Sequence, residues 1–136
     1  MKKTSLFAAT VLTLFAAAAA HAQPAMHDGA LADAAGRSVY TFDKDEASKS
    51  NCTGGCLSIW PAFVAKAEAT PKGEFGIVEA NGVRQWTVNG KPLYYFAGDA
   101  KPGDRNGDGK GGTWHLVTSK PTAQAIPAST GYTSAY

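Results

Sequence analysis

The sequence predicts a small all-β domain, built from two copies of one motif and carrying one short helix near its cysteines. Three observations predict it: two Asn-Gly dipeptides stand between β-prone runs, aromatic residues alternate along two short segments, and a Gly/Tyr-x-Phe-x-x-Asp/Trp pattern recurs 54 residues later. Asn-Gly is a strong hairpin signal because both central residues of the tight turn need positive φ. Hairpins and a meander are therefore the expected architecture.

The N-terminal segment, residues 1–22, has the three parts of a secretory signal. Two lysines precede an uncharged apolar stretch over 6–20, and Ala20-His21-Ala22 is a small-x-small cleavage site. We expect the mature chain to begin at Gln23 and to be periplasmic or secreted. The apolar run is short for a membrane span, and no Cys follows it to receive a lipid. We therefore expect no transmembrane segment and no lipid anchor.

Removal of this signal takes away two lysines and no acid, so the mature chain carries no net formal charge. Nucleic-acid binding and anchoring to anionic lipid both need a basic surplus or patch, so we expect neither. Residues 23–120 are long enough for one modest domain. Residues 121–136 are rich in Ala, Thr, Ser and Pro and are expected to form a flexible tail.

The internal repeat covers about residues 29–63 and 83–117. Comparing each residue with the one 54 positions later gives six identities where chance gives about two. The identical pairs are Gly36 and Gly90, Tyr40 and Tyr94, Phe42 and Phe96, Asp45 and Asp99, Gly55 and Gly109, and Trp60 and Trp114.

In the first copy we expect a hairpin formed by residues 29–34 and 37–42, because Ala35-Gly36 takes the place that Asn89-Gly90 has in the second copy. The polar stretch 43–50 is expected to form one helical turn. Residues 56–60 are expected to form a short helix that ends before Pro61.

In the second copy the Asn-Gly turns predict a meander of strands over 75–80, 83–88 and 91–96. Pro92 cannot donate to a ladder, so it belongs at a strand start or on an edge. A last short strand is expected over 115–117.

The aromatic residues of each copy are two positions apart, so they point to one face of a strand. The Asp that follows is well placed to accept backbone N–H bonds in a turn. A structural role is the common one for such residues, and the alternative is a binding groove made twice from Tyr hydroxyls and Asp carboxylates. The candidates are Tyr40, Phe42, Asp45, Trp60, Tyr94, Phe96, Asp99 and Trp114.

Cys52 and Cys56 are the only cysteines, and in an oxidising compartment a structural disulfide is the first expectation. A redox pair or a soft-metal site is the alternative. The spacing is not that of thioredoxin-type motifs, and no second Cys pair completes a zinc site. Met26 and His27 would be further ligands for copper.

The segment Asp104-Arg-Asn106-Gly-Asp108-Gly matches the first half of a calcium loop. The second half does not match, because position twelve is His115 rather than a bidentate Glu. An Asx- and Gly-rich turn is the simpler interpretation, with calcium binding at Asp104, Asn106 and Asp108 as the alternative.

No catalytic constellation is evident in the sequence, which lacks a nucleophile elbow and a phosphate-binding loop before a helix. We therefore expect no enzymatic activity and no resident cofactor. The first hypothesis is a non-enzymatic binding or interaction module of the cell envelope, and the alternative is a protein that handles calcium or copper.

Several segments together resemble a known family. They are Tyr40-Thr-Phe-Asp-Lys-Asp45, Cys52-Thr-Gly-Gly-Cys56 with Trp60-Pro61, Asn89 to Asp99, Pro102-Gly-Asp104 and Thr113-Trp-His115. This combination is similar to the secreted-repeat, predicted-lipoprotein family with a Tyr-x-(Phe/Trp/Tyr)-x-x-Asp motif. The resemblance covers about residues 29–118. It implies export and tandem copies of the motif but no activity, and the chain departs from the lipoprotein pattern by lacking the lipid-receiving Cys.

Overall fold

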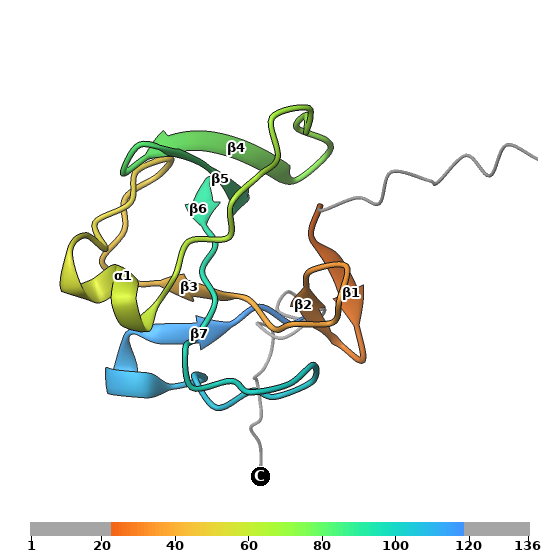
Figure 1. Ribbon diagram of the computed structural model, residues 1–136, viewed down its shortest axis with the longest axis vertical. Coiled ribbons are helices and arrows are strands. Elements are labelled where there is room, and N and C mark those ends of the chain that lie inside the picture. Colours follow the sequence, from red (N-terminus) through yellow and green to blue (C-terminus); the bar gives the residue numbers. More distant parts are fainter. Residues whose placement is uncertain (1–22, 119–136) are drawn as a thin grey trace, which may run out of the picture.

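The computed structural model describes residues 23–118, which fold into three small sheets and one short α-helix (Figure 1). In this part of the chain the strands are β1 (Ala25–His27), β2 (Ala30–Ala32), β3 (Tyr40–Phe42), β4 (Phe75–Ala80), β5 (Val83–Val88), β6 (Lys91–Pro92) and β7 (Trp114–Leu116). The helix is α1 (Gly55–Ile59), and Lys110–Gly112 is a 3-10 turn. The predicted β-dominated class is confirmed. The expected signal and tail lie outside the described residues.

The second half of the chain forms the expected meander, in the order β4–β5–β6. Asn81 and Asn89 both have positive φ at the two turns, as the Asn-Gly dipeptides predict. The last strand was expected over 91–96, but β6 ends at Pro92. Pro92 lies at the edge of this sheet, where a missing N–H leaves no ladder bond unmade.

The first half forms part of the expected hairpin. Residues 31–33 pair with 37–39 through the bridge between Ala32 and Ser38 and through two backbone bonds, from the Asp33 N–H to the Arg37 carbonyl at 3.0 Å and from the Val39 N–H to the Leu31 carbonyl at 3.2 Å. β1 also pairs with β2, and the expected hairpin does not continue into residues 40–42. β3 pairs instead with β7, from the other end of the chain. The predicted turn at Gly36 is present with φ of 87°, and the Asp33 side chain accepts the Arg37 N–H across it at 2.9 Å.

Two further local predictions have opposite outcomes. The short helix beside the cysteines is confirmed as α1, one residue earlier than expected. The helical turn over 43–50 is wrong, since this stretch is a series of turns with a bridge between Glu46 and Lys49. Asp45 explains the difference, because its carboxylate accepts the Asn51 N–H at 2.6 Å and closes a wider loop.

The buried side chains form two clusters. One is aliphatic and aromatic and lies under the β4–β5–β6 sheet: Leu31, Val39, Phe63, Ala65, Trp86, Val88 and Leu93. The other contains the motif residues: Tyr40, Cys52, Trp60, Tyr94 and Trp114, with Phe42 and Phe96 packed against them. The repeated motif therefore forms a core of its own. No helix within residues 23–118 is long and apolar enough to cross a bilayer.

Candidate functional site

The two motif tyrosines lie side by side at the centre of the molecule and exchange backbone hydrogen bonds. The Tyr40 N–H donates to the Tyr94 carbonyl at 2.8 Å, and the Tyr94 N–H donates to the Tyr40 carbonyl at 3.0 Å. Such a reciprocal pair is the hydrogen-bonded unit of an antiparallel ladder. It places equivalent residues of the two copies directly opposite each other.

Each tyrosine hydroxyl reaches the aspartate of the other copy. Tyr40 Oη donates to Asp99 Oδ2, and Tyr94 Oη donates to Asp45 Oδ2, both at 2.7 Å. Each aspartate also holds the loop that follows it, since Asp45 accepts the Asn51 N–H and Asp99 accepts the Asn106 N–H. The repeated Tyr and Asp residues thus link the copies crosswise.

The two tryptophans and the two phenylalanines complete this arrangement as a column of stacked rings. Trp60 and Trp114 stack at a centroid distance of 3.8 Å with an interplanar angle of 3°. Phe42 stacks on Trp114 at 4.2 Å and Phe96 on Trp60 at 4.6 Å. Each Trp also meets a Tyr edge-on, a favourable geometry for aromatic pairs. The rings of both copies form one continuous core.

Burial sets the electrostatics of the Tyr–Asp pairs. It raises the pKa values of Tyr40 and Tyr94, and the hydrogen bond to an aspartate raises them further. Burial also raises the pKa of Asp45, partly offset by the bonds from Tyr94 and Asn51. Both phenols are therefore protonated donors at neutral pH, and neither is poised to act as a general base.

The two Tyr–Asp pairs differ in their surroundings. Tyr40 Oη accepts the Gly107 N–H at 3.2 Å, and Asp99 is only 8% exposed. Tyr94 Oη lies 2.5 Å from the Ser50 hydroxyl, and Asp45 is only half-buried. The first pair is closed by backbone, whereas the second lies near solvent.

Gly107 fits closely against the motif core. A Cβ atom there would lie 2.8 Å from Trp60 Cη2 and 3.0 Å from Tyr40 Cζ. Sequence reasoning did not single out Gly107, and only its place inside a Gly-rich loop hinted at a close approach of backbone and ring. Ser50 and Asn51 were missed as well, because nothing in the pattern marks them.

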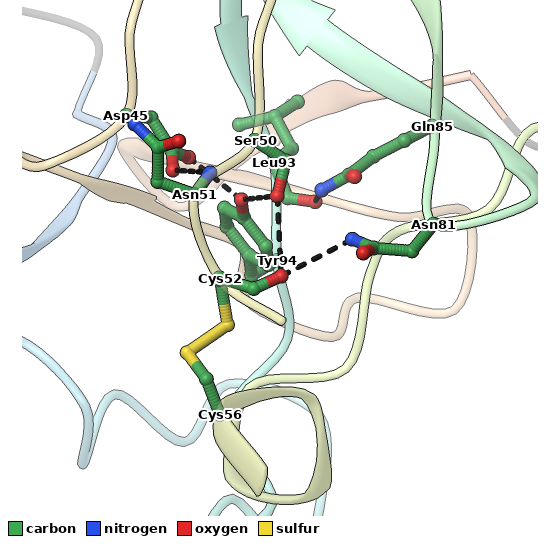
Figure 2. The surroundings of a disulfide bond; sticks show 9 residues. All are labelled: Asp45, Ser50, Asn51, Cys52, Cys56, Asn81, Gln85, Leu93 and Tyr94. Atoms are coloured by element: carbon green, nitrogen blue, oxygen red, sulfur yellow. Dashed lines mark hydrogen bonds between the residues drawn. A yellow bond between two sulfur atoms is a disulfide. The ribbon is translucent and has the colours of Figure 1, made fainter. Parts of the chain in front are cut away.

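The expected disulfide is present: Cys52 and Cys56 are bonded, with their Cα atoms 5.3 Å apart. Figure 2 shows that this bond ties α1 to the segment that runs past Tyr94 and Asp45. The Cys52 carbonyl accepts the Asn81 side chain at 3.1 Å, which connects this segment to the turn between β4 and β5 (Figure 2). The cysteines are therefore bonded to each other, and the copper hypothesis loses their thiolates as ligands.

The residues predicted to bind a metal lie outside the motif core. Met26 and His27 lie on β1 with exposed side chains. Asp104 Oδ2 accepts the Ala100 and Lys101 N–H groups, and Asp108 Oδ1 accepts the Leu116 N–H.

Residues 23–118 contain no cluster of three or more His, Cys, Asp or Glu side chains that could hold a metal ion. A calcium loop also uses Asn, so binding at Asp104, Asn106 and Asp108 stays a prediction that calcium titration calorimetry tests.

One His–Asp pair lies on the surface of the β3–β7 sheet. His115 Nε2 is 2.7 Å from Asp43 Oδ2, and about half of each side chain is exposed. An exposed pair of this kind is weakly coupled and contributes little to stability. We interpret it as a surface hydrogen bond between β7 and the residue that follows β3.

A groove of about 430 Å³ lies where the three sheets meet. Its floor is apolar and its rim carries one acid and one base. The lining residues are Met26, Leu31, Thr41, Glu74, Val88, Asn89, Lys91, Leu116, Val117 and Thr118. None of the sequence-predicted motif residues lines it, because the groove forms only when strands far apart in the sequence come together.

Comparisons with known proteins agree with the doubled architecture. The family model described as a secreted repeat of unknown function matches residues 26–64 and 77–118, more than half of the chain. Searches of curated proteins and of solved structures each found no match. The two matched segments contain the two copies found from the internal repeat. The chain therefore belongs to the family of secreted repeats of unknown function and carries two of them.

Proposed function

We propose that this protein is an exported, non-enzymatic binding module of the cell envelope, and that it binds its ligand in the groove where the three sheets meet. The observation that carries the proposal is the groove itself, with a volume of about 430 Å³ and a mixed lining. Ligand sites in proteins have volumes of this order and combine an apolar surface with a few polar groups.

The motif core is a poorer candidate for the ligand site than the groove, because its polar groups are already bonded within the protein. The hydroxyls of Tyr40 and Tyr94 bind aspartates inside the protein, and Trp60 and Trp114 are each only 6% exposed. Groups that are buried and bonded to one another serve the scaffold rather than a ligand. The open groove is the better candidate.

The lining of the groove favours an extended peptide as the ligand. Leu31 and Val88 form a buried apolar floor, while Glu74 and Lys91 give the rim one charge of each sign. An extended peptide presents apolar side chains to one face and polar groups to its borders. A strongly charged ligand of either sign would meet repulsion from one side of this rim.

A peptide array tests the proposal with a matched pair of variants. Met26 lines the groove and is 45% exposed, whereas Val64 is 49% exposed and lies outside it. We expect the wild-type protein to bind a subset of random hexapeptides. Met26→Lys should weaken that binding about fivefold, the effect of about 1 kcal/mol of lost apolar contact, and Val64→Lys should not. Equal weakening by both variants, or no bound peptide, would contradict the proposal.

Export is the second part of the proposal. It is supported by the secretory pattern of residues 1–22 and by membership of a secreted family. We expect the protein isolated from a periplasmic fraction to begin at Gln23. Intact mass and N-terminal sequencing check this, and a full-length chain in that fraction would contradict cleavage.

A further inference from the structure

The two repeats are taken as residues 26–64 and 77–118, and the contact surface between them is called the seam. The backbone contacts of the seam are mainly strand pairing. β3 of the first repeat pairs along its length with β7 of the second. The reciprocal pairing occurs too, because Tyr94 of the second repeat bridges Ala62 of the first. The Asp43 N–H donates to the Thr113 carbonyl, and its equivalent, the Ala97 N–H, donates to the Ile59 carbonyl, both at 2.8 Å.

The side chains at the seam are just as reciprocal. Each motif Tyr binds the Asp of the other repeat, and the two tryptophans stack on each other across the seam. Buried, hydrogen-bonded and shape-matched contacts of this kind are what make a protein interface specific. Each repeat is thus a recognition surface whose fitting partner is the other repeat.

The covalent connection between the repeats is a loop that takes no part in the pairing of β3 with β7. It runs over residues 66–74, between Ala65 and the start of β4. Arg84 of β5 holds this loop in its bent form, since its guanidinium donates to the carbonyls of Lys66, Ala67 and Ala69 at 2.5 to 2.9 Å. If the loop straightened, the Arg84 bonds to the Ala67 and Ala69 carbonyls would be lost, and every seam contact would remain available to another chain.

We propose that the partner recognised by the seam is a second copy of this chain, which exchanges its second repeat across the 66–74 loop to form a dimer with two complete two-repeat units. Such an exchange remakes all seam contacts, so the balance between monomer and dimer depends on the loop and on concentration. A short linker holds the repeats at an effective concentration of the order of mM. Arg84 shifts the balance toward the monomer by stabilising the bend.

Loop length provides a second control over the same balance. In the monomer the loop must cross β5, because Ala65 bonds to Arg84 on one edge while Phe75 pairs with Val88 on the other. Strand spacing and rise put that crossing at roughly 16 Å. Deleting residues 67–72 leaves three loop residues, which reach at most about 14 Å. The shortened chain can form complete units only by exchange.

The experiment uses the full chain with its disulfide intact, refolded at about 1 mM, in the range where the effective concentration of the linked repeats can be matched. Light scattering after size exclusion gives the mass. We expect Arg84→Ala to raise the dimer fraction at least fivefold over wild type, and the chain without residues 67–72 to be dimeric. Arg37→Ala is the matched control, because the Arg37 guanidinium lies over the Tyr95 ring and does not bind the loop.

Cleavage of the loop distinguishes exchange from ordinary association. A lysine-specific protease acting at Lys66 should convert an exchanged dimer into particles of monomer mass, because the loop is then the only tie between the two units. A dimer that keeps its mass after verified cleavage overturns the proposal. So does an Arg84→Ala protein that stays as monomeric as wild type and the Arg37→Ala control, whether or not the shortened chain folds.

Discussion

At the scale of single residues, the two Tyr–Asp pairs share one chemistry but lie in different surroundings. The Tyr40–Asp99 pair is deeply buried, and each of its two side chains accepts a backbone N–H. The Tyr40 hydroxyl accepts from Gly107, and Asp99 Oδ1 accepts from Asn106. The pair of Tyr94 with Asp45 has a side-chain neighbour in Ser50 and lies closer to solvent. An identical motif therefore contributes unequally to stability in its two copies.

Removing one hydroxyl at a time measures this difference. Tyr40→Phe leaves a buried carboxylate oxygen without its donor and should cost about 2 to 3 kcal/mol of unfolding free energy. Tyr94→Phe should cost about 1 kcal/mol, because water can reach Asp45 in place of the lost donor. Urea unfolding at neutral pH gives both values. Equal costs, or a larger cost for Tyr94→Phe, would contradict the assignment of the closed and open pairs.

The same phenols predict how stability falls at alkaline pH. Burial first, and then the bond to Asp99 or Asp45, raises the pKa of Tyr40 and of Tyr94 above the ordinary value of 10.0. The folded protein therefore holds these protons more tightly than the unfolded chain does. Their contribution to stability is complete below pH 10 and is lost as the pH rises above it.

The measurement is the urea midpoint at increasing pH from about 9 to 11.5, the range in which free tyrosine ionises. We expect the wild-type midpoint to fall and the Tyr40→Phe midpoint to fall less steeply. Lysines titrate in both proteins and cancel in the comparison. Parallel curves for the two proteins would show that the Tyr40 proton is not linked to folding.

At the scale of elements, the Gly-rich loop after Asp99 is packed against the column of aromatic rings. Gly107 leaves no room for a side chain between Trp60 and Tyr40, as the 2.8 and 3.0 Å approaches show. Gly55, at the start of α1, has no atom within 4 Å of a Cβ position. The two glycines are a natural pair for comparison.

We predict that Gly107→Ala destabilises the protein by about 2 kcal/mol, within the range for overpacking a buried site. Gly55→Ala should be neutral or slightly stabilising, because alanine is the better helix former and meets no neighbour there. Thermal unfolding followed by tryptophan fluorescence compares them. A Gly107→Ala protein as stable as Gly55→Ala would mean that the loop is not packed against the rings.

Local elements were predictable and long-range pairings were not. The meander and its turns followed from Asn81-Gly82 and Asn89-Gly90, because a tight turn is specified by its own residues. The pairing of β3 with β7 has no local signal, and it takes residues 40–42 out of the expected hairpin, which keeps residues 37–39 paired with 31–33. The wrong helical turn over 43–50 has the same origin, since its loop is organised by Asp45 and a tyrosine from the other repeat.

The candidate site, too, was predictable from the sequence only in part. The repeat identified which Tyr, Asp and Trp residues matter, and the structure brings all of them into one core. The sequence could not show that each Tyr binds the Asp of the opposite copy, because both partners are present in both copies. The groove was also beyond prediction, as its lining comes from six separate strands and from residues that flank the strands.

At the scale of the whole molecule, the central claim is that the two repeats fold only as a pair. The backbone ladders, the crossed Tyr–Asp bonds and the Trp60–Trp114 stack all join one repeat to the other. Within a repeat the strands form the β1–β2 hairpin in the first and the β4–β5–β6 sheet in the second, and the core residues of both repeats pack against each other across the seam. Unfolding should therefore be a single cooperative event.

The most direct test is equilibrium unfolding of the full chain labelled with 5-fluorotryptophan and followed by fluorine NMR. The chain has three tryptophans, of which Trp60 reports on the first repeat and Trp86 and Trp114 report on the second. We predict that the three native signals disappear at one urea concentration. Loss of the Trp60 signal at a clearly different concentration from the other two would contradict the account, because it would show a repeat that stays folded without its partner.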